Sequence, residues 1–299
     1  MADASWFTQF PEMERATLVA LRKTLDGAYR EFSRTYGEAI ESFFDPLLYF
    51  MVWFEKLLIN TPWLVVLAAL VALTYGASRS VKLALGVMAA FLVIGYFGMW
   101  ENTMRTLGIV AVATLLSIVL GIPVGIVMAR SDRVQAVVTP ILDIMQTMPA
   151  FVYLIPVVML LGIGKVPGII AVVVYAIPPV IRLTNLGIRL VDREVLEAAT
   201  AFGANQRQRL LEVQIPLAIP NIMAGVNQTI MMALAMVVIA SMIGVTGLGQ
   251  PVLKSINNQY FTMGLFNGLA IVAIAIMFDR ISQAYVKRSQ KNLGGMHDD

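Results

Sequence analysis

The chain has 299 residues, of which 58% are hydrophobic and only 14% are charged. This balance lies far outside that of soluble globular domains and indicates an integral membrane protein. The formal net charge is +3, and the basic residues lie between hydrophobic stretches instead of in one patch, which argues against nucleic acid as a partner. The lack of cysteine excludes disulfides and cysteine-based metal sites, and the single histidine, His297, argues against histidine chemistry.

Residues 1–60 carry mixed charge and an amphipathic pattern. Asp45-Pro46 has the residue types of a helix N-cap and a first helical turn. The apolar stretch that follows contains Glu55 and Lys56 and is too short to cross about 30 Å of hydrocarbon. We expect an extracytoplasmic tail with an amphipathic helix lying in the membrane interface, and a re-entrant or spanning segment is the alternative. The apolar residues at helical spacing are Ile40, Phe44, Leu47, Leu48, Met51 and Leu58.

Seven hydrophobic stretches follow this tail. They predict an all-α, polytopic membrane protein with about seven transmembrane helices, of which the first is short. The predicted spans lie near residues 62–77, 81–99, 103–129, 137–162, 166–188, 217–244 and 262–282.

The connections between the spans alternate between rich and poor in Lys and Arg, which predicts their orientation. The rich connections hold Arg79 and Lys82; Arg130 and Arg133; Arg182, Arg189, Arg193, Arg207 and Arg209; and Arg280, Lys287, Arg288 and Lys291. The poor connections hold Arg105 beside Glu101, Lys165, and Lys254. We expect the rich set in the cytoplasm. This places residues 192–215 and the C-terminus inside, and the N-terminal tail outside.

The spans are rich in proline and glycine. Gly121 and Gly125 have the small-xxx-small spacing that allows two helices to approach closely. Packing and kinks alone are one interpretation, and helices that bend during gating are the other. The prolines are Pro123, Pro149, Pro156, Pro178, Pro179 and Pro220.

A polar insert of more than twenty residues separates the fifth and sixth predicted spans. Asp192 is placed to cap a first short helix, and Gly203 is the residue type that ends a helix in the left-handed conformation. Asn205 and Gln208 have the spacing of a capping box that opens a second helix. Pro216 suits the first turn of the next span. The sequence therefore predicts two short helices at the membrane surface, a shape suited to docking on a soluble partner.

The same insert resembles the "EAA" signature of ABC importer permeases, which reads EAA, three residues, Gly, nine residues, Ile-x-Leu-Pro. The matching residues are Glu197, Ala198, Ala199, Gly203, Val213, Ile215 and Pro216. Two apolar positions differ, with Val for Ile and Ile for Leu. The resemblance implies that Glu197, Ala198, Ala199, Gly203 and Pro216 are ATPase-coupling residues. The coupling loop itself, residues 192–215, would lie in a groove of an ATP-binding subunit. An ordinary capped loop is the alternative.

Further segments resemble the glycine betaine/proline betaine (quaternary-amine) uptake family of type I ABC importer permeases. These segments are Gln146–Pro156, Gly162–Pro167, Pro178–Thr184, Ala224–Thr229, Val238–Ile243 and Gly247–Gly249. The resemblance implies an ABC type-1 transmembrane domain over residues 101–283. Two accessory spans over 61–100 precede it, and a cytoplasmic tail over 284–299 follows it. It also implies a bacterial inner membrane location, a homodimer, two cytoplasmic ATPase subunits that carry ATP and Mg, and an extracytoplasmic binding protein.

The sequence also indicates that the energy for transport comes from another polypeptide. The chain contains no Gly-x4-Gly-Lys-Ser/Thr loop to cradle the phosphates of ATP, and its cytoplasmic segments are too short for an ATPase domain. We therefore expect a transport subunit that is not an enzyme and binds no cofactor of its own.

Polar residues inside the sixth predicted span are candidates for the translocation path. They are Asn227, Gln228, Thr229 and Ser241. Polar side chains in a span face the bundle or a wet cavity, and hydrogen bonding between helices is the alternative role. Asp279-Arg280, near the inner end of the last span, is interpreted as a pair that snorkels to the cytoplasmic interface.

Aromatic side chains are the second set of path candidates, because a quaternary ammonium is held best by aromatic faces. Phe151, Tyr153 and Tyr175 are the expected contacts, and Trp100 is placed to meet the binding protein. Anchoring at the membrane interface is the alternative for all four.

The sequence leaves alternatives open both for the substrate and for the class of transporter. Choline, carnitine, histidine and proline are other substrates of related importers. A stand-alone osmolyte channel or a secondary transporter is the alternative class, and dependence on ATP separates it from an ABC importer.

Overall fold

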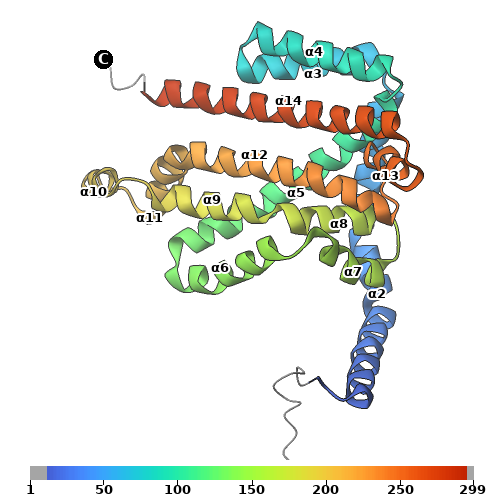
Figure 1. The fold of residues 1–299 in the computed structure, drawn as a ribbon. Coiled ribbons are helices and arrows are strands. Elements are labelled where there is room, and N and C mark those ends of the chain that lie inside the picture. The colour runs from blue at the N-terminus through green and yellow to red at the C-terminus, as the bar shows by residue number, and fades with distance from the viewer. Residues whose placement is uncertain (1–11, 295–299) are drawn as a thin grey trace, which may run out of the picture.

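The computed structural model describes residues 12–294, with side chains described through Val286. Every regular element in this range is a helix, as Figure 1 shows. The first half comprises α2 (Arg15–Asn60), α3 (Trp63–Ser78), α4 (Val81–Tyr96), α5 (Trp100–Arg130), α6 (Asp132–Thr147), α7 (Ala150–Leu161) and α8 (Lys165–Ala176). The second half comprises α9 (Pro178–Arg189), α10 (Arg193–Ala201), α11 (Gln206–Gln208), η1 (Arg209–Gln214), α12 (Ile215–Ala240), η2 (Ser241–Ile243), α13 (Gly249–Asn258) and α14 (Phe261–Gly294). His297 lies outside the described residues.

The N-terminal segment is one helix of 46 residues instead of a tail with a short helix after Pro46. The predicted start at Asp45-Pro46 is therefore wrong. A proline inside a helix removes one backbone hydrogen bond and costs about 3 kcal/mol, and the long bonded runs on both sides outweigh this cost. Figure 1 shows α2 running steeply across the direction of α12 and α14, and the α2–α3 bend is 108°.

Four helical segments are long and apolar enough to cross a membrane, and up to six if each of two bent helix pairs is one span. The four are Trp100–Arg130, Lys165–Arg189, Gln206–Ile243 and Phe261–Val286. They match four of the seven predicted spans. The predicted spans near 62–77 and 81–99 are the 16-residue helices α3 and α4, which are shorter than the roughly 20 residues that about 30 Å of hydrocarbon requires.

The predicted span over residues 137–162 consists of two helices with a sharp bend between them. Helix α6 ends at Thr147, α7 begins at Ala150, and the two are bent by 100°. Met148 has extended backbone, with φ −66° and ψ 132°, because the ring of Pro149 disfavours the helical conformation in the residue before it.

The second short helix of the polar insert and the sixth span form one continuous helix from Gln206 to Ile243. We predicted a separate helix and a new start at Pro216. Instead the π-helix η1 joins α11 to α12, and Pro216 lies in the first turn of α12. A π-helical turn has wider i to i+5 bonding, so the chain reaches Pro216 without ending the helix. Helix α13, which the hydropathy pattern did not predict, follows at the far end.

The core of the bundle forms where α5, α9 and α12 cross, and glycines set the distances there. A Cβ at Gly121 would lie 2.5 Å from Val180 Cγ1, and one at Gly125 would lie 2.6 Å from Thr184 Cβ. A Cβ at Gly225 would lie 3.0 Å from the Cα of Val180. The close packing predicted from the Gly121/Gly125 spacing is thus confirmed, with α9 as the partner helix.

Candidate functional site: the polar loop at α10 and the pocket at α13

The capping signals of the polar insert are confirmed. The Asp192 carboxylate accepts a hydrogen bond from the Glu194 N–H at 2.9 Å and begins α10. Asn205 and Gln208 form both bonds of a capping box, each at 2.9 Å. Gly203 lies between the two helices with φ +86°, a conformation that favours glycine. Figure 1 shows α10 and α11 projecting from the end of the bundle opposite α13.

Helix α10 presents an open surface to solvent. Glu197 and Ala198 are exposed and Ala199 is half-buried. Phe202, at the end of α10, is 92% exposed, and the sequence reasoning missed it, although an aromatic residue directly before the turn glycine of a polar loop was a usable signal. A hollow of about 450 Å³ adjoins these residues. Its lining residues are Arg193, Leu196, Glu197, Thr200, Ala201 and Arg209.

The loop is braced against the bundle by arginines. Arg209 donates to the Thr200 hydroxyl at 3.0 Å, which ties the long helix to α10. Arg189 lies 2.7 Å from an Asp132 carboxylate oxygen and donates to the Met128 carbonyl at 2.9 Å. These bonds join the ends of α5, α6 and α9. The sequence reasoning used these arginines only for topology. They also hold together the helix ends from which α10 projects.

The polar path candidates on the sixth span do not come together. The Asn227 amide donates to Asp279 at 2.9 Å, and Gln283 donates to the same carboxylate at 2.8 Å. Thr229 is buried, whereas Gln228 is exposed. Consecutive residues on a helix point about 100° apart, so the three neighbours face different surroundings. The snorkelling interpretation is wrong for Asp279, whose carboxylate joins α14 to α12.

Two of the three aromatic path candidates form a pair. The rings of Tyr153 and Tyr175 meet edge to face with centroids 5.8 Å apart. Tyr153 is buried and its hydroxyl donates to the Met145 carbonyl, which connects α7 to α6 across the bend. Phe151 is 53% exposed. Trp100 is half-buried and packs edge to face on Phe91 at 6.3 Å.

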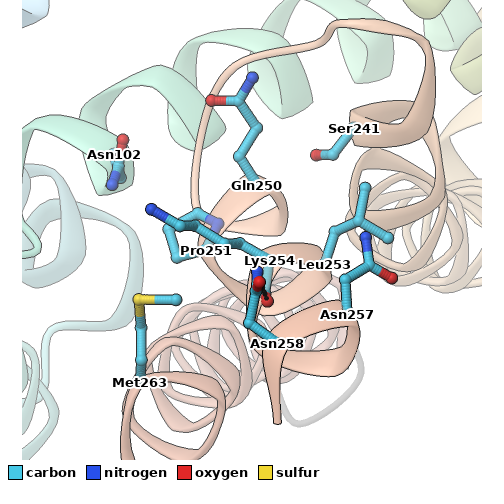
Figure 2. Close-up of a pocket in the computed structure, with 9 residues that line it drawn as sticks. All are labelled: Asn102, Ser241, Gln250, Pro251, Leu253, Lys254, Asn257, Asn258 and Met263. Atoms are coloured by element: carbon cyan, nitrogen blue, oxygen red, sulfur yellow. Dashed lines mark hydrogen bonds between the residues drawn. The ribbon is translucent and has the colours of Figure 1, made fainter. Parts of the chain in front are cut away.

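A polar cavity of about 550 Å³ opens at the opposite end of the bundle from α10. Figure 2 shows its lining, in which amide, hydroxyl and ammonium groups from α5, α12–η2 and α13 surround the opening. Ser241 is the only predicted path residue among its lining residues, and it also donates to the Val237 carbonyl at 3.1 Å. The remaining lining residues are Asn102, Gln250, Pro251, Leu253, Lys254, Asn257, Asn258 and Met263. Such a lining offers hydrogen-bond donors to a carboxylate or a polar loop.

The chain is similar to known transport proteins over most of its length. A family model described as binding-protein-dependent transport system inner membrane component matches residues 121–291. The glycine betaine/proline betaine transport system permease protein ProW of Escherichia coli (strain K12) is 46% identical over 249 residues, 83% of this chain and 70% of that protein. The glycine betaine transport system permease protein OpuAB of Bacillus subtilis (strain 168) is 40% identical over 282 residues, 94% of this chain and 99% of that protein.

The fold has a counterpart among solved structures. An inward-facing structure of the MetNI methionine ABC transporter superposes with a TM-score of 0.57 at 20% identity, covering 62% of this chain and 93% of that chain. This likeness establishes the fold, that of an ABC importer transmembrane subunit. A component of this kind is a non-catalytic, multi-pass subunit of the inner membrane, and it implies an ATPase and a binding protein as partners. The chain belongs to the family of binding-protein-dependent transport system inner membrane components.

Proposed function

We propose that the chain is the membrane-spanning permease of an ATP-driven importer for glycine betaine, proline betaine or a related quaternary amine. The observation that carries this proposal is the 40% identity to a glycine betaine permease along 94% of this chain and 99% of that protein. The names of ProW and OpuAB supply the substrate class. Substrate would arrive from the binding protein and cross the membrane by alternating access.

The coupling step is assigned to the loop at α10. Glu197, Ala198 and Ala199 would lie against the ATPase. Gly203 would set the turn between α10 and α11, and Pro216 would lie where the loop joins α12. Phe202 supports this assignment, because a side chain that is 92% exposed at the tip of α10 offers an anchor for an apolar pocket. A second copy of this chain would supply a second loop to a second ATPase subunit.

The proposed orientation places α10 in the cytoplasm and α2 and α13 outside. Its support is the clustering of Lys and Arg in the connections at the α10 end of the bundle. The same reasoning places residues 1–60 outside and 284–299 inside. The division into accessory helices over 61–100 and a transport domain over 101–283 follows from the family resemblance. Lipid contact by α2 is supported by the exposed apolar side chains of Phe43, Phe50 and Trp53.

Within the bundle, we propose that the substrate passes nearest to the predicted path residues that are exposed, line the pocket or form an aromatic pair. Ser241 at the outer pocket, Gln228, Phe151 and the Tyr153–Tyr175 pair remain path candidates. Hydrogen bonding between helices is the role we favour for Asn227, because its amide donates to Asp279. Burial on the same helix favours a packing role for Thr229.

Competition during uptake tests the substrate class. Proteoliposomes would hold this chain with its ATPase, with ATP inside and the binding protein outside. Unlabelled proline betaine and glycine betaine should both suppress the entry of radiolabelled glycine betaine, whereas histidine and proline should not. Suppression by choline or carnitine would widen the range of quaternary amines accepted. Uptake of histidine or proline without uptake of glycine betaine would contradict the proposal.

A further inference from the structure

A carboxylate on α2 is buried between two cations that come from different helices. Glu55 is 6% exposed. One of its oxygens accepts from Lys165 Nζ at 2.5 Å, and the other lies 3.8 Å from Arg105 Nε. Lys165 is the first residue of α8, and Arg105 lies in the second turn of α5. The three helices therefore meet through one side chain, at the end of the bundle away from α10.

The cost of burying a charge explains why Glu55 is paired with cations here. A buried carboxylate is expensive unless it is paired and hydrogen-bonded, and here Lys165 supplies the hydrogen bond. Arg105 also pairs with Glu101, whose side chain is 59% exposed. Arg105 Nε has no hydrogen-bond partner among the described residues. Lys165 is therefore the principal partner of Glu55, and Arg105 adds attraction without a bond.

Close backbone packing brings these groups together. A Cβ at Gly108 would lie 3.8 Å from the Cα of Glu55 and 3.9 Å from the Leu58 side chain. Even the Cβ of an alanine at this point of α5, one turn beyond Arg105, would lie in ordinary van der Waals contact with α2, so the two helices are directly packed. The sequence separation between Glu55 and Lys165 is 110 residues, so only the fold places them in contact.

Helix α2 has a second attachment, to the end of α7, before the turn that leads to α8. The Ser33 hydroxyl donates to the Met159 carbonyl at 3.2 Å, and the Tyr29 hydroxyl donates to the Pro156 carbonyl. Met159 lies in the last turn of α7, where helix carbonyls lack partners within the helix. Helix α2 is thus bonded to the end of α7 through Ser33 and to the start of α8 through Glu55.

We propose that Glu55 is a positioning residue that makes α2, α5 and α8 move as one body during transport. The proposal rests on the proposed function as a permease, because alternating access requires helix ends to move in a defined way. Helix α2 lies outside residues 121–291, the part that the family model matches, and Lys165 lies inside it. The ion pair therefore joins an additional helix to the family domain. Helices α5 and α8 also pack directly against each other. Loss of the ion pair would therefore loosen α2 from α8, and ATP hydrolysis would be poorly converted into transport.

The transport test measures substrate molecules moved per ATP hydrolysed in proteoliposomes that contain the complete transporter. Glu55→Gln keeps the shape and removes the charge, and it should lower this ratio about fivefold to tenfold, the loss that follows from about 1–1.4 kcal/mol. Lys56→Gln is the matched control, since Lys56 is the exposed neighbour on the same helix, and it should leave the ratio unchanged. Glu55→Asp keeps the carboxylate between the two cations and should retain most of it.

A distance measurement tests the anchor without substrate or ATP. The chain has no cysteine, so spin labels can be attached to Trp53→Cys on α2 and Ile163→Cys beside α8, both exposed positions. The distance distribution should be narrow in the parent, broad with Glu55→Gln, and narrow with Glu55→Asp.

Two results would overturn the inference. One is an unchanged distance distribution together with an unchanged transport ratio in Glu55→Gln. The other is a Glu55→Asp chain that folds but has a transport ratio and a distance distribution as poor as those of Glu55→Gln. A failed substrate assignment would leave the distance result intact, so the two failures are distinguishable.

Discussion

Replacing Gly203 with valine should reduce ATP-driven uptake by about tenfold or more, the change that about 1.4 kcal/mol produces. Gly203 has φ +86°, and a left-handed backbone costs an ordinary residue roughly 1–2 kcal/mol, with β-branched residues the least tolerant. No described atom lies within 4 Å of a Cβ built at this position. The effect would therefore come from backbone strain, which moves α10 away from the position that the ATPase requires.

Two variants separate this effect from general damage. Gly203→Asn should retain much more uptake, because asparagine tolerates the left-handed region. Gly98→Val is the matched control at the other end of the bundle. Gly98 has φ +73° and, like Gly203, open space around its Cβ position. Purification of the permease with its ATPase should fail for Gly203→Val and succeed for Gly98→Val. Equal loss in both would show that strain alone, and not the position of α10, decides the result.

Replacing Gly125 with leucine should lower the thermal unfolding midpoint of the detergent-solubilised chain by about 5–10 °C. A Cβ at Gly125 would lie 2.6 Å from Thr184 Cβ and 2.7 Å from the Ile181 carbonyl oxygen. The carbonyl belongs to the backbone of α9 and cannot move without moving that helix. The added side chain would therefore separate α5 from α9 and weaken the core of the transport domain.

Gly86 provides the control for this change. It also lies in the middle of an apolar helix, α4, but a Cβ there would meet no described atom within 4 Å. Gly86→Leu should leave the unfolding midpoint unchanged or raise it slightly, because leucine has the higher helix propensity. A midpoint for Gly125→Leu equal to that of Gly86→Leu would contradict the packing described for α5 and α9.

Local signals in the sequence predicted local structure well. The Asp192 cap, the Gly203 turn and the Asn205–Gln208 box each depend on bonds within three residues, and all three are present. The resemblance to ABC permeases rested on the same segment. For this reason the family and the candidate coupling site could be predicted without a structure.

Proline shows where such reasoning fails. Pro149 breaks the chain between α6 and α7, whereas Pro46, Pro123 and Pro220 lie inside continuous helices. The residue type is the same in each case. The outcome depends on whether the helical hydrogen bonds on both sides of the proline outweigh its cost, which the residue type alone does not show. For this reason the bend inside the span predicted near 137–162 was missed, and the helix start predicted at Pro46 was wrong.

Contacts between residues far apart in the sequence could not be predicted either. Glu55 and Lys165 were assigned to separate outer segments, and nothing in a single sequence pairs them. Asp279 was expected at the membrane surface, but it accepts a hydrogen bond from Asn227, 52 residues away. In both cases a charged group in an apolar stretch was a visible signal that a partner was required, although the sequence did not identify that partner.

The location of the ATP that drives uptake is the most direct test of the central claim, that α10 faces the cytoplasm and receives the action of an ATPase. Proteoliposomes with this chain and its ATPase would be given binding protein and radiolabelled glycine betaine on the outside. Only complexes whose binding-protein face points outward would then take part in uptake. ATP enclosed within the vesicles should drive accumulation, and ATP added only outside should not. Equal uptake without ATP, or without the ATPase subunit, would contradict the account.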